Sequence, residues 1–521
     1  MFQYFIYALA LSSSFAAARI GPSDVKQYLS DVSGNRLKEI HPLDWKIDGA
    51  SKDDSNTIEL NPSETMQRFD GMGGSFMRAG STVFNKMPEN VQGQILADLF
   101  DQKDGASFVL GKIPIGATDF GVPTWYTYAD EQQSEDLPDF NMDHDTLESQ
   151  DGFVPYVRRA QEAAGRPLRL QATLDYPPDW MLNTSTPLPF ADINSTYIPA
   201  LANYYYKYYK EIANQGLRLD YVALVNEVTD SYVNISYPNM RTLLVDYVAP
   251  MFRAAEHAPQ LTWSAKFSRR VTQEASPAFY EMDGVQDSTD VIFYHGYDCN
   301  YGPAEDIGWE CTGSAGLNTT CPYLEDAARE MRTFYEQYGR NRTIWMTELC
   351  YASEFGDYNV SHGCPVIPRL DFDDAMQWGD MIFADLNIVG ANGWIYWNLI
   401  LDTTGGPWLD SAEHNDPNPN EQQPVIVADP ESGEYYLTGV YFAMNHFSRY
   451  IAVDSVRIGA SANGVYPTIQ FTAYTNADRN QITIVCMNDD PDTHSFTLKY
   501  KHLSTEVTMP AISFLTLVFD I

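Results

Sequence analysis

Between residues 69 and 398, short apolar runs alternate with stretches in which apolar side chains recur at helical spacing. Eight runs have the length of a strand, and they cover 69–76, 108–115, 168–174, 221–227, 261–267, 291–295, 343–348 and 393–398. The helix-compatible stretches between them include 86–101, 197–214, 241–256, 325–338 and 372–389. Runs that are apolar almost throughout suit a parallel sheet buried on both faces. Strand–helix alternation repeated eight times therefore predicts an α/β fold, a closed (β/α)8 TIM barrel.

The pattern changes near residue 450, where strand-like runs follow one another with turn residues and no helical stretch between them. These runs cover 453–458, 464–473, 481–487, 495–500 and 513–519. They favour an all-β unit, an antiparallel β-sandwich attached to the barrel. Residues 19–65 contain short strands and turns with too little apolar material for a core of their own, so we expect them to join the sandwich. The predicted organisation is N-terminal strands at 19–65, a barrel at 66–449 and a C-terminal sandwich at 450–521.

The first eighteen residues have the features of a secretory signal. Residues 5–12 form a short apolar segment, and Ala16, Ala17 and Ala18 supply the small side chains of a cleavage site. No other stretch approaches 18 uninterrupted apolar residues, so we expect no membrane span. The sequence therefore predicts a signal peptide at 1–18 and delivery to the medium or to a lysosome-like acidic compartment.

Sequons and cysteines agree with passage through a secretory pathway. Six Asn-x-Ser/Thr sequons fit a glycoprotein, and they begin at Asn183, Asn194, Asn234, Asn318, Asn341 and Asn359. Six cysteines permit disulfide bonds without making the chain a disulfide scaffold. We expect one bond between Cys350 and Cys364 and another within the group Cys299, Cys311 and Cys321. No CxxC or closely spaced Cys/His set supports a zinc site, so no metal is expected.

The charge balance argues against several classes of binding partner. The 521 residues include 70 acidic and 33 basic side chains, which gives a formal net charge of −37. Nucleic acids require clustered Lys and Arg, so we expect no nucleic-acid partner. Strong binding to anionic membranes or anionic polysaccharides is disfavoured for the same reason. A second interpretation of the charge is that many secreted proteins working at acidic pH carry surplus carboxylates.

Two glutamates end apolar runs and carry the candidate chemistry. Glu227 closes the run at 221–227, and Glu348 closes the run at 343–348. A carboxylate at the carboxyl end of a barrel strand lies where TIM barrels build their active sites. Two carboxylates facing one bond are the minimum for cleaving a glycosidic linkage. Because Asn226 offers a neutral donor for a sugar 2-hydroxyl beside Glu227, we assign Glu227 as acid/base and Glu348 as nucleophile.

Motifs along most of the chain carry a family resemblance. They are Phe69-Asp-Gly-Met-Gly-Gly-Ser75, Lys112-Ile-Pro-Ile-Gly-Ala-Thr-Asp119-Phe120, Tyr126-Thr-Tyr-Ala-Asp130, Asn226-Glu227, His295-Gly-Tyr297, Thr347-Glu348, Gly393-Trp-Ile-Tyr-Trp397-Asn398, Gly405-Gly-Pro-Trp408, Gln423-Pro-Val-Ile-Val-Ala-Asp429 and Tyr441-Phe-Ala-Met-Asn-His-Phe-Ser-Arg-Tyr450. In their order and spacing they resemble glycoside hydrolase family 30, and most of all its glucosylceramidase (acid β-glucosidase) branch.

The resemblance implies a retaining mechanism, a barrel fused to a β-sandwich, and no metal or organic cofactor. By the same resemblance, Asp119 hydrogen-bonds hydroxyls of the nonreducing sugar, and His295 and Tyr297 line the cleft near the nucleophile. Trp397 forms the floor under the sugar ring, which agrees with the stacking of aromatic faces on pyranose rings. From the residues alone, Trp397 fits core packing as well, and His295 fits a structural role.

The chain departs from the family pattern at three positions. In the loop after the third strand, Asp175 stands where the family usually has tryptophan, followed by the Pro-x-Trp that contains Trp180. Val228 replaces a usual proline, and Lys112 replaces a common arginine whose planar fork lysine does not reproduce. Asp175 and Trp180 lie at the implied sugar subsite, so Asp175 bears on which sugar is accepted.

We expect an exo-acting β-glycosidase that acts on β-glucosides including glucosylceramide, at acidic pH because Glu227 must carry a proton. Two alternatives are a relative acting on β-1,6-glucan, β-galactoside or β-xyloside chains, and a non-catalytic secreted carbohydrate-binding protein. The presence of both Glu227 and Glu348 argues against the non-catalytic alternative. The expected partner is a carbohydrate or glycolipid substrate, with transient contact to a membrane surface in the glycolipid case. The sequence leaves open the sugar, the aglycone, exo or endo action and the oligomeric state.

Overall fold

We describe a computed structural model of the chain over residues 21–47, 55–131, 133–183, 191–228, 233–299, 324–339, 342–352, 368–409 and 420–521. The expected signal peptide at 1–18 lies outside these ranges, as do the sequons at Asn318, Asn341 and Asn359. Cys311, Cys321 and Cys364 also lie outside them, so each expected disulfide involves a residue that is not described. Among the described residues, no helix is long and apolar enough to cross a bilayer.

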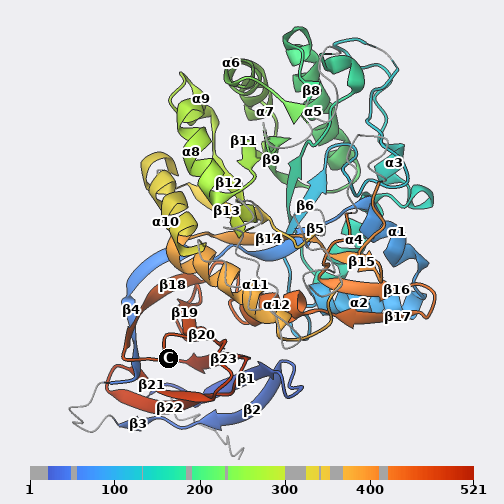
Figure 1. Cartoon of the computed structure of the whole chain (residues 1–521). Helices are drawn as coiled ribbons and strands as arrows, with labels where there is room; N and C mark the ends of the chain where they lie inside the picture. The colour runs from blue at the N-terminus through green and yellow to red at the C-terminus, as the bar shows by residue number, and fades with distance from the viewer. Residues whose placement is uncertain are drawn as a thin grey trace, which may run out of the picture.

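Eight parallel strands close into a barrel in the larger part of the molecule (Figure 1). They are β5 (Gly71–Ser75), β6 (Leu110–Pro114), β7 (Arg169–Thr173), β9 (Leu219–Asn226), β11 (Gln260–Lys266), β12 (Val291–His295), β13 (Thr343–Glu348) and β14 (Gly393–Asn398). Each strand pairs with the next barrel strand along the chain, and β14 closes the ring on β5. Strands β12 and β14 are buried at every position, as runs that are apolar almost throughout require. The predicted TIM barrel is confirmed.

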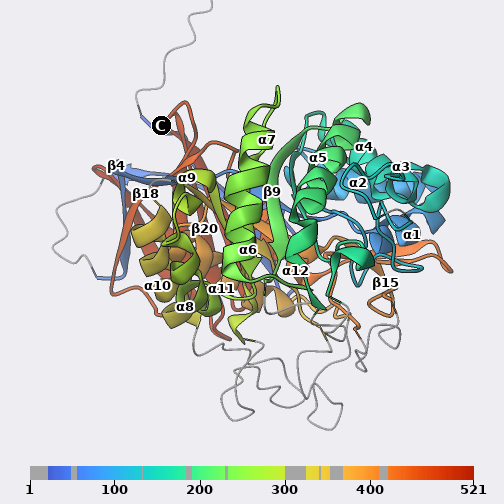
Figure 2. The same ribbon diagram turned by 90° about the horizontal axis from the view of Figure 1, so that it is seen from above.

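Helices follow the strands and cover the outside of the barrel, and Figure 2 shows several of them side by side. They are α1 (Arg78–Lys86), α2 (Glu89–Phe100), α4 (Phe153–Ala164), α5 (Ile198–Asn214), α6 (Tyr237–Arg241), η4 (Thr242–Val248), α7 (Ala249–Arg253), α8 (Arg269–Tyr280), α10 (Leu324–Phe334), η7 (Tyr335–Gly339), α11 (Asp374–Phe383) and η9 (Ala384–Val389). Helix α5 illustrates the packing, because Leu201, Tyr205, Tyr208 and Ile212 recur at three- and four-residue spacing and are all buried. The Tyr208 hydroxyl donates to the carbonyl of Pro114 at 2.8 Å, which ties the helix to β6.

Shorter elements lie in the loops and at the barrel edge. They are α3 (Asp143–Thr146), β8 (Ala191–Asp192), β10 (Val233–Asn234), α9 (Val285–Ser288), β15 (Ile400–Asp402), β16 (Ile426–Asp429), β17 (Glu434–Leu437) and α12 (Gly439–Ser448). β8 pairs with β10, and β15, β16 and β17 form a small sheet of their own. These strands interrupt the βα loops without joining the barrel.

A ten-stranded β-sandwich forms the second part of the molecule, and it lies below the barrel in Figure 1. Its strands are β1 (Val25–Asp31), β2 (Lys38–Leu43), β3 (Lys46–Ile47), β4 (Thr57–Arg68), β18 (Val456–Asn463), β19 (Ile469–Thr475), β20 (Gln481–Asn488), β21 (His494–Tyr500), β22 (Leu503–Met509) and β23 (Ser513–Asp520). The sandwich is confirmed, with two differences from the sequence-based expectation. β22 was not predicted, because apolar and polar residues alternate along it rather than forming an apolar run. β21 also pairs with β4 in parallel, so the sandwich is not entirely antiparallel.

Helix α12 joins the two parts of the molecule. The ring of His446 stacks on Phe514 of β23 at 5.3 Å, and its two nitrogens contact the hydroxyls of Thr516 and Ser30 at 2.9 and 2.8 Å. Phe447 packs edge-on against the same Phe514. Burial lowers the pKa of His446 to about 3, so the imidazole is neutral between the two hydroxyls. Helix α12 therefore packs the barrel onto strands β23 and β1 of the sandwich.

Candidate active site

Glu227 and Glu348 lie at the same end of the barrel, because both stand at the carboxyl ends of parallel strands. Glu348 is the last residue of β13, and Glu227 directly follows β9. Glu227 has a φ of 43°, in the left-handed region that residues with a Cβ rarely adopt. Its backbone N–H donates to the carbonyl of Ala265 in β11 at 3.0 Å, which holds the bent backbone in place. Strained backbone of this kind concentrates at functional sites.

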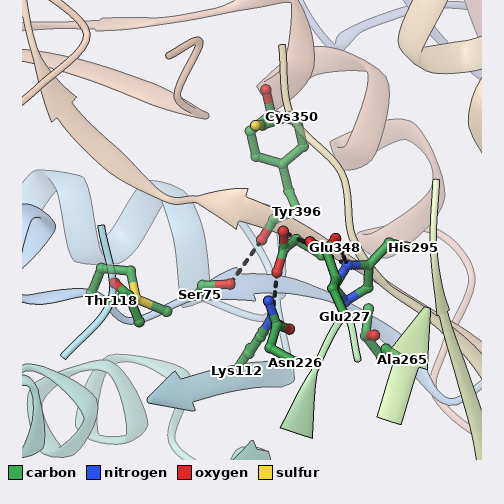
Figure 3. A network of polar contacts seen from close by, with 12 residues as sticks. Ser75, Lys112, Thr118, Asn226, Glu227, Ala265, His295, Glu348, Cys350 and Tyr396 are labelled. Carbon is green, nitrogen blue, oxygen red and sulfur yellow. Dashed lines mark hydrogen bonds and ion pairs between the residues drawn. The ribbon is translucent and has the colours of Figure 1, made fainter. Parts of the chain in front are cut away.

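Both oxygens of the Glu348 carboxylate receive a hydrogen bond, and Figure 3 shows the one from Lys112. The Lys112 ammonium donates to Oε2, and the Tyr297 hydroxyl donates to Oε1 at 2.9 Å. Burial would raise the pKa of Glu348, but His295, Lys112 and Tyr297 together lower it below its ordinary value. Since His295 is itself neutral, as described next, Lys112 and Tyr297 supply the stabilisation. Glu348 is therefore an ionised carboxylate.

The imidazole of His295 bridges the two glutamates. Its Nδ1 lies 2.6 Å from Oε1 of Glu227 and 3.7 Å from Oε1 of Glu348. The ring is fully buried, and burial lowers the pKa of His295 to about 3 despite the opposing effect of Glu348. The imidazole is neutral, so one proton is shared in the contact between Nδ1 and Glu227. His295 contacts Glu227 and is not an isolated structural histidine.

The two carboxylates are close together. Ligand atoms of Glu227, His295 and Glu348 all lie within 4.8 Å of one another. This is the one group of three or more His, Cys, Asp and Glu side chains with metal-binding spacing among the described residues. Lys112 already pairs with Glu348, and an ammonium beside the group competes with a bound cation. The arrangement suits two carboxylates acting on one bond better than it suits a metal centre.

Asn226 and two aspartates lie beside the glutamates. Asn226 Oδ1 accepts a hydrogen bond from Lys112 at 3.4 Å. Asp119 is partly covered and accepts a hydrogen bond from the amide of Asn420 at 2.9 Å. Burial raises the pKa of Asp119 to about 7, and the carboxylate of Glu348 adds to the rise. Burial likewise raises the pKa of Asp175 to about 8, against the effect of the nearby Lys112 ammonium.

The two tryptophans among the predicted site residues lie in different surroundings. Trp397 lies in β14 under the site, where the Lys112 ammonium stands 4.5 Å from the centre of its ring. Trp180 is turned to other partners, because its indole N–H donates to the carbonyl of Ala129 at 2.7 Å and its ring packs edge-on against Tyr197. Neither contact involves a residue of the glutamate cluster. The other predicted residues lie in or beside the glutamate cluster, and the role of Trp180 in sugar binding stays a prediction.

Three residues of the site were not among the predicted ones. Lys112 was noted only as a departure from the family pattern, although a lysine inside an apolar strand is itself a signal of a buried ion pair. Cys350 Sγ lies 3.5 Å from the Tyr297 hydroxyl, and its position two residues after Glu348 indicates this proximity. Asn420 lies in a segment without periodic pattern, and nothing in the sequence points to its contact with Asp119.

The third departure, Val228, has a local explanation. Its backbone N–H donates to the hydroxyl of Ser264 at 3.3 Å. Proline has no backbone N–H, so it could not make this bond. The substitution leaves the Glu227 backbone tied to β11 from both sides.

Comparisons with known proteins agree with this geometry. The model of the glycosyl hydrolase family 30 TIM-barrel domain matches residues 69–255 and 317–451, and that of the family 30 beta sandwich domain matches residues 454–517. Lysosomal acid glucosylceramidase of Mus musculus is 21% identical over 84% of this chain and 78% of the mouse protein. An endo-1,6-beta-D-glucanase of Neurospora crassa is 22% identical over 92% of this chain and 91% of its own length.

Solved structures share the same backbone. The crystal structure of SrfJ from Salmonella typhimurium superimposes with a TM-score of 0.77 at 17% sequence identity, over 95% of this chain and 99% of that one. The two domain models together match well over half of the chain, in the order in which the barrel and the sandwich occur. The protein therefore belongs to glycosyl hydrolase family 30 and is a glycoside hydrolase.

Proposed function

We propose that this protein is a retaining β-glycosidase in which Glu348 is the nucleophile and Glu227 is the acid/base. The separation of the two carboxylates carries the proposal. Retaining enzymes place these groups about 5–5.5 Å apart, whereas inverting enzymes leave about 6.5–9.5 Å for a water molecule. One oxygen of Glu227 lies within 4.8 Å of one oxygen of Glu348, and this short distance favours the retaining arrangement.

The roles follow from the different surroundings of the two glutamates. Glu348 is held ionised by Lys112 and Tyr297, so a lone pair is available to attack the anomeric carbon. As that bond forms, the bond to the leaving oxygen breaks, and the oxygen takes the proton of Glu227. Glu227, now ionised, then takes a proton from water, whose oxygen displaces Glu348 from the anomeric carbon. The neutral His295 beside Glu227 accommodates both of its protonation states without adding a charge.

We propose β-glucosides, including glucosylceramide, as the preferred substrates. The similarity to the mouse lysosomal acid glucosylceramidase supports this choice. A β-1,6-glucan is the second candidate, since the Neurospora crassa endo-1,6-beta-D-glucanase aligns over most of both chains. β-Galactosides and β-xylosides are the remaining sugars to test, and a protein that binds carbohydrate without cleaving it is the alternative outside enzyme function.

We also propose an acidic working environment, reached through the secretory pathway. The net charge of −37 and the apolar segment at residues 5–12 support this proposal. Asp119 and Asp175 add to it, because both carry raised pKa values and are neutral at acidic pH. A neutral sugar then meets fewer unpaired charges in the site at acidic pH.

The test is hydrolysis of nitrophenyl β-glucoside, β-galactoside, β-xyloside and a β-1,6-glucan between about pH 4 and pH 7. We expect Glu348→Gln to lower kcat by about 10⁴-fold or more and Glu227→Gln to lower it by about 10²–10⁴-fold. Glu336→Gln, a change on an exposed helical surface, is the matched control and should leave kcat unchanged.

The products formed with azide distinguish the nucleophile from the acid/base. With a dinitrophenyl β-glucoside, Glu227→Ala should form the glycosyl-enzyme and release β-glucosyl azide, because azide replaces water on the same face. Glu348→Gly should release α-glucosyl azide, because azide attacks the anomeric carbon directly. The opposite pairing of products would reverse the assignment, and inactivity of the unaltered protein on every glycoside would favour the carbohydrate-binding alternative.

A further inference from the structure

Asp175 is a buried carboxyl group of the barrel mouth, and one of its oxygens receives no hydrogen bond within the described part of the chain. The residue follows the end of β7 by two positions and is 5% exposed. Its Oδ2 is buried and accepts no hydrogen bond from the described residues. Buried polar atoms are nearly always paired, so an unpaired one requires an explanation.

The neighbours of Asp175 place it inside the glutamate cluster. The ammonium of Lys112 lowers the pKa of Asp175, and the carboxylates of Glu348 and Asp119 raise it, while a hydrogen bond from Asn226 lowers it. Lys112 can only donate, so the Asn226 amide oxygen faces Lys112 and the amide nitrogen faces Asp175. Figure 3 shows Lys112 and Asn226 side by side below Glu348. Asn226 thus anchors the Asp175 carboxyl group and leaves Oδ2 without a partner.

Asp145 shows what a structural aspartate looks like in the same barrel. It is fully buried, and its two oxygens accept hydrogen bonds from Tyr126 at 2.7 Å and Tyr128 at 2.6 Å. The fold therefore supplies donors where a buried aspartate serves packing. Asp175 lacks a donor for Oδ2, although it lies where a substrate would bring hydroxyl groups.

We propose that Asp175 determines sugar specificity by hydrogen-bonding the 3-hydroxyl of the glycosyl unit that Glu348 attacks. The inference rests on the proposed function. The sequence assigns Asn226 to the 2-hydroxyl and Asp119 to other hydroxyls of the same sugar, and the Asp175 carboxyl group interacts with both side chains. The 3-hydroxyl is the next group around a pyranose ring from the 2-hydroxyl. A hydroxyl both donates and accepts, so it can pair with Oδ2 in either protonation state of the carboxyl group.

The experiment compares kcat/KM on nitrophenyl β-glucoside and on its 3-deoxy analogue for the unaltered protein, Asp175→Leu and Asp175→Asn. We expect Asp175→Leu to lower kcat/KM on the glucoside about 10- to 100-fold and to change kcat/KM on the 3-deoxy analogue little. Asp175→Asn keeps an acceptor and a donor, so it should recover much of the glucoside activity. Comparing the two substrates in each protein cancels the intrinsic reactivity of the 3-deoxy sugar.

Thermal unfolding of the free protein is the second readout. Asp175→Leu removes an unpaired buried oxygen and also the acceptor of the Asn226 amide; the two effects oppose each other, so we expect Tm to change little. Asp145→Leu, the matched control, removes an acceptor and leaves two buried tyrosine hydroxyls unpaired, so its Tm should fall.

Equal losses on both substrates in Asp175→Leu, or a Tm that falls as in Asp145→Leu, would overturn the role of Asp175 while leaving the glycosidase proposal intact. Failure of the unaltered protein both to hydrolyse the glucoside and to bind glucose by calorimetry would overturn both proposals together. If the protein binds glucose without hydrolysing a glucoside, the test becomes its affinity for glucose against its affinity for 3-deoxyglucose. Equal affinities of the unaltered protein for the two sugars would contradict the inference.

Discussion

Lys112 contacts three residues of the active site. Its ammonium donates to Glu348 and to Asn226, and it lies 4.5 Å from the ring centre of Trp397. The side chain is fully buried, so its charge is compensated by Glu348 rather than by water. One cation therefore favours the ionised form of Glu348 and holds the side-chain amide of Asn226.

This contact predicts a change in pH dependence. Lys112→Met removes the charge that lowers the pKa of Glu348, so the pKa of that carboxyl should rise. Because Glu348 attacks only when ionised, the acidic limb of the kcat/KM profile should move to higher pH. The measurement is kcat/KM against pH on nitrophenyl β-glucoside. Lys112→Arg keeps the positive charge, so the acidic limb of its kcat/KM profile should stay at the same pH. An acidic limb that does not move in Lys112→Met would contradict this account.

At the scale of elements, the barrel depends on a close approach of β5 to β6. Gly73 pairs with Leu110 in these strands. A Cβ on Gly73 would stand 1.7 Å from the Leu110 carbonyl oxygen and 2.6 Å from its carbon. Backbone atoms of a paired strand cannot move aside without breaking the ladder, so any side chain here separates two of the eight strands.

Gly73→Ala should therefore destabilise the protein by about 3 kcal/mol or more, or prevent soluble expression. Thermal unfolding followed by circular dichroism measures the change. The control is Gly93→Ala on the exposed face of α2, where an added Cβ meets nothing within 4 Å. That substitution should raise stability by up to about 1 kcal/mol, since alanine favours helix. Equal effects of the two substitutions would show that the strand contact is not limiting.

The whole molecule carries buried aspartates whose pKa values are raised, with burial as the largest cause. They are Asp145 and Asp374 at about 6, Asp175 at about 8, and the partly covered Asp119 and Asp380 at about 7. Between pH 4 and these values the folded protein binds protons that the unfolded chain has released. Its stability therefore falls as pH rises through this range.

Two buried histidines have the opposite effect on how stability depends on pH. The pKa values of His295 and His446 are lowered to about 3, so below their ordinary pKa the unfolded chain binds protons that the folded protein does not. The five aspartates outnumber the two histidines, and the effect of the aspartates on stability extends to higher pH. We expect Tm to be higher at about pH 5 than at about pH 8, by about 3 °C or more.

Scanning calorimetry at the two pH values measures this difference. Repeating it in about 1 M salt, where exposed charges are screened within about 3 Å, separates the buried groups from the repulsion of the net charge of −37. The difference should survive the salt. A higher Tm at about pH 8 would contradict the assignment of raised pKa values.

The pattern of apolar residues was enough to predict the barrel, the sandwich and the positions of Glu227 and Glu348 at strand ends. Hydrophobic periodicity is local, and parallel strands in one barrel all end on the same face, so a carboxylate after a strand is placed by pattern alone. Strand β22 was not predicted, because polar residues alternate with apolar ones along it and no apolar run forms. The motif that contains Trp180 does not reveal the edge-on packing of its ring against Tyr197.

The contacts within the site could not be predicted from the sequence, because they form only in the folded barrel. The pairing of Lys112 with Glu348, the neutral state of His295 against Glu227 and the unpartnered oxygen of Asp175 each depend on residues far apart in the chain. Ionisation and hydrogen bonding respond to burial and to neighbours within a few ångströms, and both arise only when the strands close into the barrel.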